Sequence, residues 1–330
     1  MAFYVYVKDL IAIETDRTDF EWTFGRSCCQ TDRAGFDSSL IRIHLKLEKD
    51  NLIARDAESE EYSSQFSSFS VSIKNKEIIF RKTLFHTVTV AYKLKLDGND
   101  IYFSAGRAYY DLIKLRMMNM HSVRYILSDL VSGMLLLNHY VPLYCSTVCV
   151  EDKLIMIFGA PAAGKTLSAM QLIKQPDSRL LSEDVSVSDG HSVWSVPFTS
   201  TYGQHENGIN INPASAQGEL TAQLSNSKYI FLLEKGNSKT ENNDTDISKK
   251  ICLLNRYIFH YDNSPINTIC AYFFEEISLE QMRKNECELV KALCDHSVCA
   301  VLRESDPLLF AARISECADI DGKKKSANAS

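Results

Sequence analysis

The alternation of apolar and polar residues predicts a β-rich first third of the chain. Residues 41–48 alternate strictly, as a strand with one buried face requires, and residues 1–7 follow a similar pattern. Comparable runs predict strands over 69–73, 78–80, 87–96 and 101–103. The Asp-Gly-Asn-Asp segment at 97–100 predicts a hairpin turn between the last two. We therefore expect a β-rich N-terminal domain over residues 1–111.

The apolar period becomes helical after this region. The residues that can line one side of one or two helices are Ile113, Val123, Ile126, Leu127, Leu130, Met134 and Leu137. Pro142 should end that segment. Residues 112–140 are therefore predicted to be linking helices between two domains.

The remaining pattern mixes strands with helices. Strands are predicted over 143–150, 153–158, 179–184, 229–233 and 298–302, with a hairpin formed by 185–187 and 193–196. Helices are predicted over 167–174, 253–258 and 281–293. The polar residues 239–246 predict a surface loop. These elements define a second domain over 141–318, followed by a polar tail, 319–330, that we expect to be disordered.

Residues 159–166 carry the strongest chemical signal. They read Gly-Ala-Pro-Ala-Ala-Gly-Lys-Thr and match the phosphate-binding pattern G-x-x-x-x-G-K-[ST] between a buried strand and a helix. Glycines let successive backbone N–H groups point at phosphate oxygens, and the helix adds its positive N-terminal end. The motif predicts that Lys165 reaches the phosphates of ATP and that Thr166 binds Mg²⁺. The expected nucleotide-binding residues are Gly159, Ala160, Ala162, Ala163, Gly164, Lys165 and Thr166.

An acidic pair follows the motif closely. Glu183 and Asp184 end the next predicted strand, and Glu183 comes 17 residues after Thr166. A right-handed β–α–β crossover ends both strands at the same sheet edge, so both carboxylates should lie beside Lys165. Both Glu183 and Asp184 can bind Mg²⁺ through their hard oxygen atoms, and a second carboxylate beside the metal can accept a proton from an attacking hydroxyl. A solvated acidic turn is the alternative interpretation of the same pair.

These segments resemble the catalytic domain of the HPr kinase/phosphorylase superfamily. The resemblance rests on 143–150, the loop at 159–166, Leu-Leu-Ser-Glu-Asp-Val at 180–185 and Val-Pro-Phe at 196–198. It covers about 140–235 well and extends loosely to 318. It implies an α/β nucleotide domain of the HPr-kinase-like (PEP-carboxykinase-like) P-loop type, within an α+β chain. A strand hairpin entering the loop and the close acidic pair distinguish this group from common P-loop proteins.

The resemblance also implies an activity. The family gives the first acid of the pair, here Glu183, the general-base role, and the second, Asp184, a metal-binding role. The layout of the N-terminal region resembles stand-alone kinases found beside modified-peptide gene clusters, which phosphorylate a peptide serine. Such proteins assemble through the nucleotide domain, so a homo-oligomer is an expectation. Two departures stand out: Tyr144 replaces a histidine common in the family, and Glu183 replaces an aspartate.

We therefore expect an ATP- and Mg²⁺-dependent kinase that phosphorylates a hydroxyl, on a serine of a small ribosomally made peptide or protein. The family's later phosphorylase motif is not legible, so we expect kinase activity alone. A kinase of free amino acids, a nucleotide-binding scaffold with degenerate catalysis, and an ATPase or GTPase switch remain alternatives. The absence of an Asn-Lys-x-Asp segment disfavours the GTPase.

Other polar residues are candidates for the acceptor site or for charge stabilisation. Arg256 and Arg303 could each act as an arginine finger, and His191 is predicted at a hairpin tip. The residues predicted to face the substrate, unless their segment is only a polar loop, are Thr199, Ser200, His205 and Glu206.

Composition and net charge limit the kinds of partner and the cellular compartment that we expect. A net charge of −6 disfavours nucleic acids and anionic membranes, and no apolar stretch reaches the roughly 18 residues of a membrane span. The N-terminus lacks the basic start of a secretory signal. The ten cysteines contain no C-x-x-C, and the nearest metal-like spacing is Cys294, His296 and Cys299. Buried reduced thiols explain them better, which predicts a cytoplasmic protein.

Overall fold

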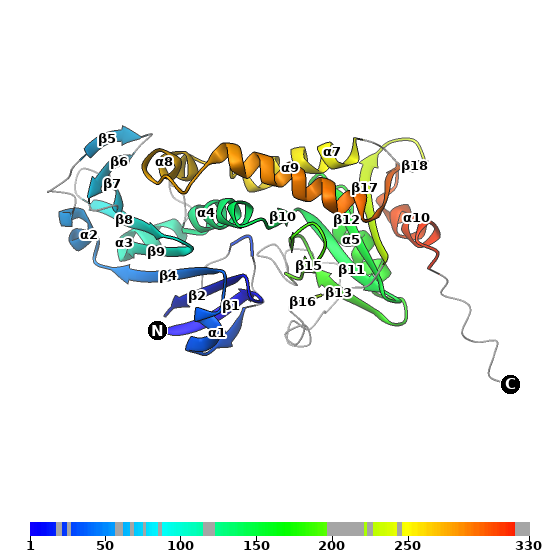
Figure 1. Cartoon of the computed structure of the whole chain (residues 1–330), viewed down its shortest axis with the longest axis horizontal. Coiled ribbons are helices and arrows are strands. Elements are labelled where there is room, and N and C mark those ends of the chain that lie inside the picture. Colours follow the sequence, from blue (N-terminus) through cyan, green and yellow to red (C-terminus); the bar gives the residue numbers. More distant parts are fainter. Residues whose placement is uncertain are drawn as a thin grey trace. The chain divides into compact units, whose positions relative to one another are not determined.

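The structure is a computed structural model of the 330-residue chain (Figure 1). It describes residues 1–17, 22–24, 28–56, 62–66, 69–74, 77–84, 88–114, 123–196, 221–222, 227–242 and 246–320. The predicted tail beyond residue 320 lies outside these ranges. Within them, no helix has both the length and the apolar character needed to cross a membrane.

The chain forms two compact units with interleaved segments. Unit 1 comprises Met1–Trp22, Cys28–Met134 and Ser264–Ser278, and unit 2 comprises Thr23–Ser27, Leu135–Asn263 and Leu279–Ser330. The sequence pattern predicted residues 264–278 in the second domain, whereas in the structure they belong to unit 1. The helix predicted to link the domains, α4 (Val123–Leu137), contributes to both units.

Unit 1 is built on one nine-stranded mixed sheet with the order β3-β1-β2-β4-β9-β8-β7-β6-β5. Its strands are β1 (Ala2–Val7), β2 (Ile11–Thr15), β3 (Cys29–Thr31), β4 (Ile41–Glu48), β5 (Tyr62–Phe66), β6 (Phe69–Lys74), β7 (Glu77–Leu84), β8 (Val88–Asp97) and β9 (Asp100–Gly106). The predicted β8–β9 hairpin is present, and Gly98 has the positive φ of 57° that its turn requires. Helices of this unit are α1 (Arg33–Asp37), α2 (Asp50–Asp56), α3 (Arg107–Lys114) and α8 (Pro265–Phe273).

Unit 2 contains a six-stranded sheet with the order β13-β11-β12-β17-β19-β18. Its strands are β11 (Cys145–Val150), β12 (Lys153–Gly159), β13 (Ser178–Ser182), β17 (Ser227–Lys235), β18 (Lys239–Asn242) and β19 (Val298–Glu304). The helices are α5 (Lys165–Leu172), α7 (Ile247–Phe259), α9 (Leu279–Asp295) and α10 (Phe310–Cys317), and a 3₁₀ turn, η2 (Pro307–Leu309), precedes α10. The described architecture is therefore mixed α and β with mixed sheets.

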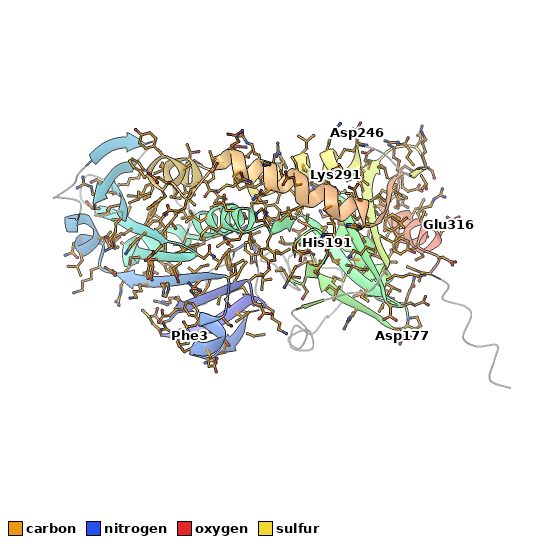
Figure 2. All side chains as sticks on the ribbon, in the orientation of Figure 1. Phe3, Asp177, His191, Asp246, Lys291 and Glu316 are labelled. Carbon is orange, nitrogen blue, oxygen red and sulfur yellow. The ribbon has the colours of Figure 1, made fainter. Side chains whose placement is uncertain are left out.

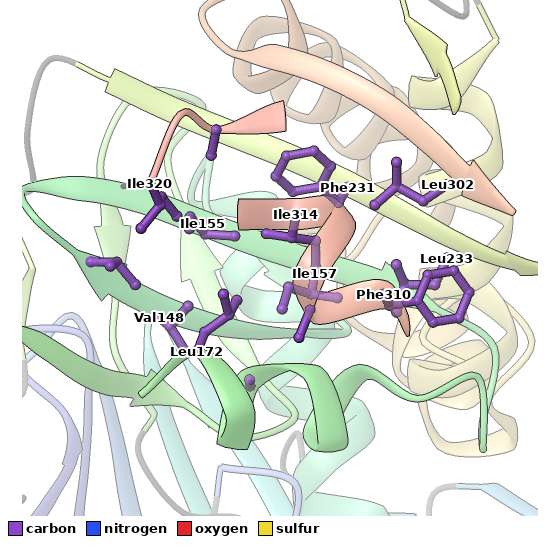
Figure 3. Packing of buried hydrophobic residues seen from close by; sticks show 14 of the residues in the cluster. Val148, Ile155, Ile157, Leu172, Phe231, Leu233, Leu302, Phe310, Ile314 and Ile320 are labelled. Carbon is purple, nitrogen blue, oxygen red and sulfur yellow. The ribbon is translucent and has the colours of Figure 1, made fainter. Parts of the chain in front are cut away.

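One hydrophobic core cluster of unit 2 lies on one face of this sheet (Figure 3). Alternate residues of neighbouring strands, such as Ile155 and Ile157 on β12 and Phe231 on β17, point to this face, as the period of two requires. Leu172 of α5 and Phe310 of α10 cover them. This packing fixes α5, and with it the loop that precedes α5, against the sheet.

Two predictions for this unit were wrong. The strand expected over 143–150 is divided into β10 (Val141–Leu143), which pairs with β14 (Ser186–Ser188), and β11, which belongs to the larger sheet. The polar segment 239–246 contains the edge strand β18 and, at Asp246, the N-cap of α7, although we expected a surface loop. The smaller sheet continues from β14 through β15 (Val193–Trp194) to β16 (Thr221–Ala222).

Candidate functional site

The predicted phosphate-binding segment forms a tight turn between β12 and α5. Ala162 and Gly164 have positive φ angles of 62° and 106°, and the Ala163 N–H donates to the Ala160 carbonyl at 3.0 Å. Successive residues with alternating backbone hand orient N–H groups toward one concave side, which is the geometry of an anion-binding nest. Residues 160–162 are exposed. The turn is therefore accessible to a ligand from solvent.

Both glycines of the motif are required sterically. A Cβ on Gly159 would lie 2.9 Å from the Ala163 Cβ, and one on Gly164 would lie 3.0 Å from the Pro307 Cβ. Gly164 also has a φ angle that side chains disfavour. The turn thus needs glycine at these positions because it packs closely against itself and against η2.

The strand register brings the acidic pair to the same edge as the turn. β11 is antiparallel to both β12 and β13, so β12 and β13 run in the same direction on either side of it. Thr147 of β11 pairs with Ser182, and Cys145 pairs with Phe158. Glu183 and Asp184 follow Ser182 directly and therefore leave the sheet beside the start of the turn, as the short spacing predicted.

Lys165 is folded into this edge. Its ammonium nitrogen lies 3.2 Å from the Gly159 carbonyl, 3.8 Å from Asp184 Oδ1 and 3.8 Å from the centroid of the Tyr144 ring. The side chain is only 4% exposed. Burial lowers the pKa of Lys165, and the charge of Asp184 opposes the shift. A cation is thus held in a desolvated position directly beneath the turn.

Tyr144 makes contacts in this candidate site that its sequence context did not predict. Its ring supports the Lys165 ammonium, and its backbone N–H donates to the buried Asn255 Oδ1 of α7 at 3.0 Å. Burial, followed by Asp184 and Glu183, raises the pKa of Tyr144, so the phenol stays protonated at neutral pH. From the sequence, Tyr144 was notable only because many members of the resembled family have histidine at this position. In the structure it contacts Lys165 and lies beside the acidic pair.

The two acids differ in exposure. Asp184 is 20% exposed, whereas Glu183 is 1% exposed. The Glu183 carbonyl accepts a hydrogen bond from Ser146 Oγ at 2.5 Å, which anchors the pair to β11. Thr166, in the first turn of α5, is half-buried. The more accessible carboxylate is therefore the one beside Lys165.

Small polar side chains below the acids fix the strand ends. Thr147 Oγ1 and Ser186 Oγ are 2.8 Å apart, and Ser182 Oγ accepts from the Val196 N–H at 2.9 Å. Cys145 lies 3.5 Å from Thr147 Oγ1, and burial raises its pKa to about 11, so it remains a thiol. These contacts support the site without adding a charge.

Of the remaining sequence candidates, the two arginines are engaged in ion pairs. Thr199, Ser200, His205 and Glu206 lie outside the described residues. Arg256 is paired with Glu286 at 2.7 Å, and Arg303 is paired with Glu234 and Glu241 at 2.8 and 2.7 Å.

His191 occupies the predicted hairpin tip between β14 and β15. Its backbone N–H donates to Asp189 Oδ1 at 2.8 Å, and its ring centroid lies 4.8 Å from that of His296. Both residues belong to unit 2 (Figure 2 labels His191).

The cysteines are all free thiols, but burial is not general. Cys145, Cys149, Cys252, Cys270 and Cys299 are buried, whereas Cys287 is exposed and the others are intermediate. The expectation of reduced thiols agrees with this state, and the expectation that all are buried was wrong.

Comparison of the chain with protein-family models and with curated proteins gives no match. The function must therefore be inferred from the geometry of residues 144, 159–166 and 183–184.

Proposed function

We propose that this chain is an ATP- and Mg²⁺-dependent kinase that phosphorylates a hydroxyl, on a serine of a small peptide or protein. The observation that carries the proposal is the approach of Asp184 to within 3.8 Å of Lys165 Nζ, directly below an exposed turn with two positive φ angles. An ammonium, an anion-binding turn and a carboxylate are the groups that phosphoryl transfer needs at one point.

The turn and Lys165 would bind the nucleotide phosphates. The main-chain N–H groups of residues 162 and 164–166 and the N-terminus of α5 offer positive potential, whereas Pro161 has no N–H and the Ala163 N–H is already bonded to the Ala160 carbonyl. Lys165 would exchange its contact with the Gly159 carbonyl for phosphate oxygens. That exchange is favourable because a phosphate provides the charged acceptor that the carbonyl lacks.

Asp184 and Thr166 would hold the magnesium ion. Both present hard oxygen atoms beside the turn, which suits Mg²⁺. When bound, Mg²⁺ neutralises charge on the phosphate oxygens. Tyr144 would keep Asp184 oriented, since its phenol remains protonated next to that carboxylate. Glu183 would accept the proton of the attacking hydroxyl.

The peptide acceptor is proposed from the family resemblance of residues 143–198 and of the N-terminal layout. Unit 1 offers sheet-edge strands, β3 and β5, of the kind that capture extended peptides in other proteins. An assembly through the nucleotide domain is proposed on the same resemblance.

The test is acceptor-dependent release of ADP from Mg·ATP. Serine-containing peptides encoded near the gene should stimulate turnover and gain the mass of one phosphoryl group. Lys165→Ala and Glu183→Gln should both abolish the stimulated rate. Lys153→Ala, at the start of strand β12, which leads into the turn, should leave this rate unchanged. Stimulated turnover that survives Lys165→Ala would refute the kinase proposal.

A nucleotide-binding scaffold is the second candidate, and the burial of Glu183 favours it. A carboxylate that is 1% exposed reaches an acceptor hydroxyl only if the acceptor enters the protein deeply. A scaffold would bind Mg·ATP with the same dependence on Lys165 but would show no acceptor-dependent ADP release. The turnover and binding assays together therefore separate the two functions.

A further inference from the structure

Helices α7 and α9 of unit 2 bring together two thiols and a carboxylate that the candidate kinase site does not use. One oxygen of Glu286 and the sulfurs of Cys252 and Cys287 all lie within 4.8 Å of one another. Cys252 comes from α7, and the other two are consecutive on α9. In Figure 2, Asp246 marks the residue before α7 and Lys291 marks α9.

Arg256 holds one oxygen of the Glu286 carboxylate, and the Tyr261 hydroxyl also lies close to this carboxylate. Arg256 Nε donates to Glu286 Oε2 at 2.7 Å, and Arg256 Nη2 donates to Cys287 Sγ at 3.3 Å. Glu286 is fully buried, and within the described part of the chain its Oε1 has no hydrogen-bond partner of normal geometry. A buried oxygen that accepts no hydrogen bond destabilises the folded state unless a ligand supplies the missing interaction.

Burial raises the pKa of the Glu286 carboxyl, and the neighbouring Tyr261 hydroxyl and Arg256 oppose the shift. Burial also raises the pKa of the Cys252 thiol well above its ordinary value, with Glu286 adding to the effect. A metal ion that binds here would have to displace the thiol protons, and its positive charge would favour the thiolates.

The charges and distances suit a thiophilic divalent cation. Two thiolates and one carboxylate carry −3, Arg256 carries +1, and a divalent ion brings the sum to zero. Tetrahedral coordination at about 2.3 Å from sulfur requires ligand atoms about 3.8 Å apart. The side chains would therefore close by about 1 Å, which rotation about their χ angles can supply. Cys287 is exposed, so the ion has an entry path and a solvent molecule can take the fourth position.

We propose that Cys252, Glu286 and Cys287 form a zinc-binding site that joins α7 to α9. No local sequence pattern predicts this site, because Cys252 lies 34 residues before Glu286 and no C-x-x-C is present. The site is separate from residues 159–184 and does not depend on the kinase proposal. Helix α7 connects the two sites, because Asn255 of α7 accepts a hydrogen bond from the backbone N–H of Tyr144.

The test is a competition titration of Zn²⁺ against a chromophoric chelator, using full-length protein previously treated with EDTA and a reductant. The wild-type chain should bind one equivalent. Cys252→Ser and Cys287→Ser should each weaken binding by at least about tenfold, since even changes outside the ligand set cost that much. Cys317→Ser, a half-buried thiol on α10 of the same unit, is the matched control and should bind as the wild type does.

Cobalt substitution gives a readout that does not depend on affinity. The Co²⁺ form should show a sulfur-to-cobalt charge-transfer band, and this band should weaken in Cys287→Ser, whose exposed position keeps the fold intact as judged by circular dichroism. Absence of stoichiometric binding, or equal loss in Cys317→Ser, would overturn the proposal. So would quantitative oxidation of Cys252 and Cys287 to a disulfide by peroxide in a protein that binds no metal.

Discussion

The contact between the Lys165 ammonium and the Tyr144 ring should stabilise unit 2 measurably. The nitrogen lies 3.8 Å from the ring centroid, and the lysine side chain is 4% exposed. Cation–π contacts contribute about 2 kcal/mol when they are desolvated and about 0.5–1 kcal/mol when they are exposed. The geometry places this contact at the upper value, which corresponds to roughly a 30-fold change in the unfolding equilibrium constant.

A double-mutant cycle isolates this term. The cycle compares the unfolding free energies of the parent, Lys165→Met, Tyr144→Leu and the double variant in urea. The sequence has two tryptophans, Trp22 in unit 1 and Trp194 in unit 2, so a Trp22→Phe background lets Trp194 fluorescence report unit 2 alone. The cost of that background change cancels because all four proteins carry it.

The expected coupling energy is about 2 kcal/mol. A cycle that uses Tyr144→Phe in place of Tyr144→Leu should give a coupling close to zero, because Phe keeps the ring that contacts Lys165. Saturating Mg·ATP should reduce it, because Lys165 would then contact phosphate. A coupling below about 0.5 kcal/mol, the size of an exposed contact, would refute the placement of Lys165 over the ring.

Two further substitutions test the turn and the pH dependence of folding. Gly164→Ala should destabilise the protein by about 1–3 kcal/mol, because residue 164 has a φ of 106° and its added Cβ would lie 3.0 Å from the Pro307 Cβ. Urea denaturation should show a larger loss of stability for Gly164→Ala than for Gly98→Ala, because an added Cβ at Gly98 meets open space. An equal cost would contradict this packing. Burial raises the pKa of Asp129 to about 6 from 3.8, opposed by its hydrogen bond from Ser264 Oγ at 2.6 Å. Between about pH 4 and 6 the folded state therefore holds a proton on Asp129 that the unfolded state has released, so the free energy of unfolding falls as pH rises through this range. Asp129→Asn should raise the free energy of unfolding by up to roughly 3 kcal/mol at pH 7 and should change it little at pH 4. A stability difference that does not change with pH would exclude this origin.

Local patterns predicted most strands and the centre of the candidate site. β4 matches its alternating segment residue for residue, and the strand–turn–helix around residues 159–166 follows from apolar runs and glycines. The position of the acidic pair followed from chain connectivity, since a short crossover leaves few places for the second strand to end.

Contacts between distant residues could not be predicted in this way. Tyr144 and Asn255 meet because α7 packs near β10, which no local pattern encodes. β18 was missed because it is a polar edge strand, held by pairing with β19 and by the ion pairs of Glu241 with Lys239 and Arg303. The Cys252, Glu286 and Cys287 cluster likewise arises only when two helices pack.

The most direct test of the central claim is calorimetric titration of Mg·ATP into the wild-type chain, Lys165→Ala and Lys153→Ala. Lys153 provides a matched control because it lies on the same strand but donates to the Ala318 and Asp319 carbonyls at 2.8 and 2.7 Å. We predict saturable, magnesium-dependent binding in the wild type and in Lys153→Ala, and its loss in Lys165→Ala. Binding that is absent from the wild type, or unchanged in Lys165→Ala, would contradict the claim that residues 159–166 hold a nucleotide.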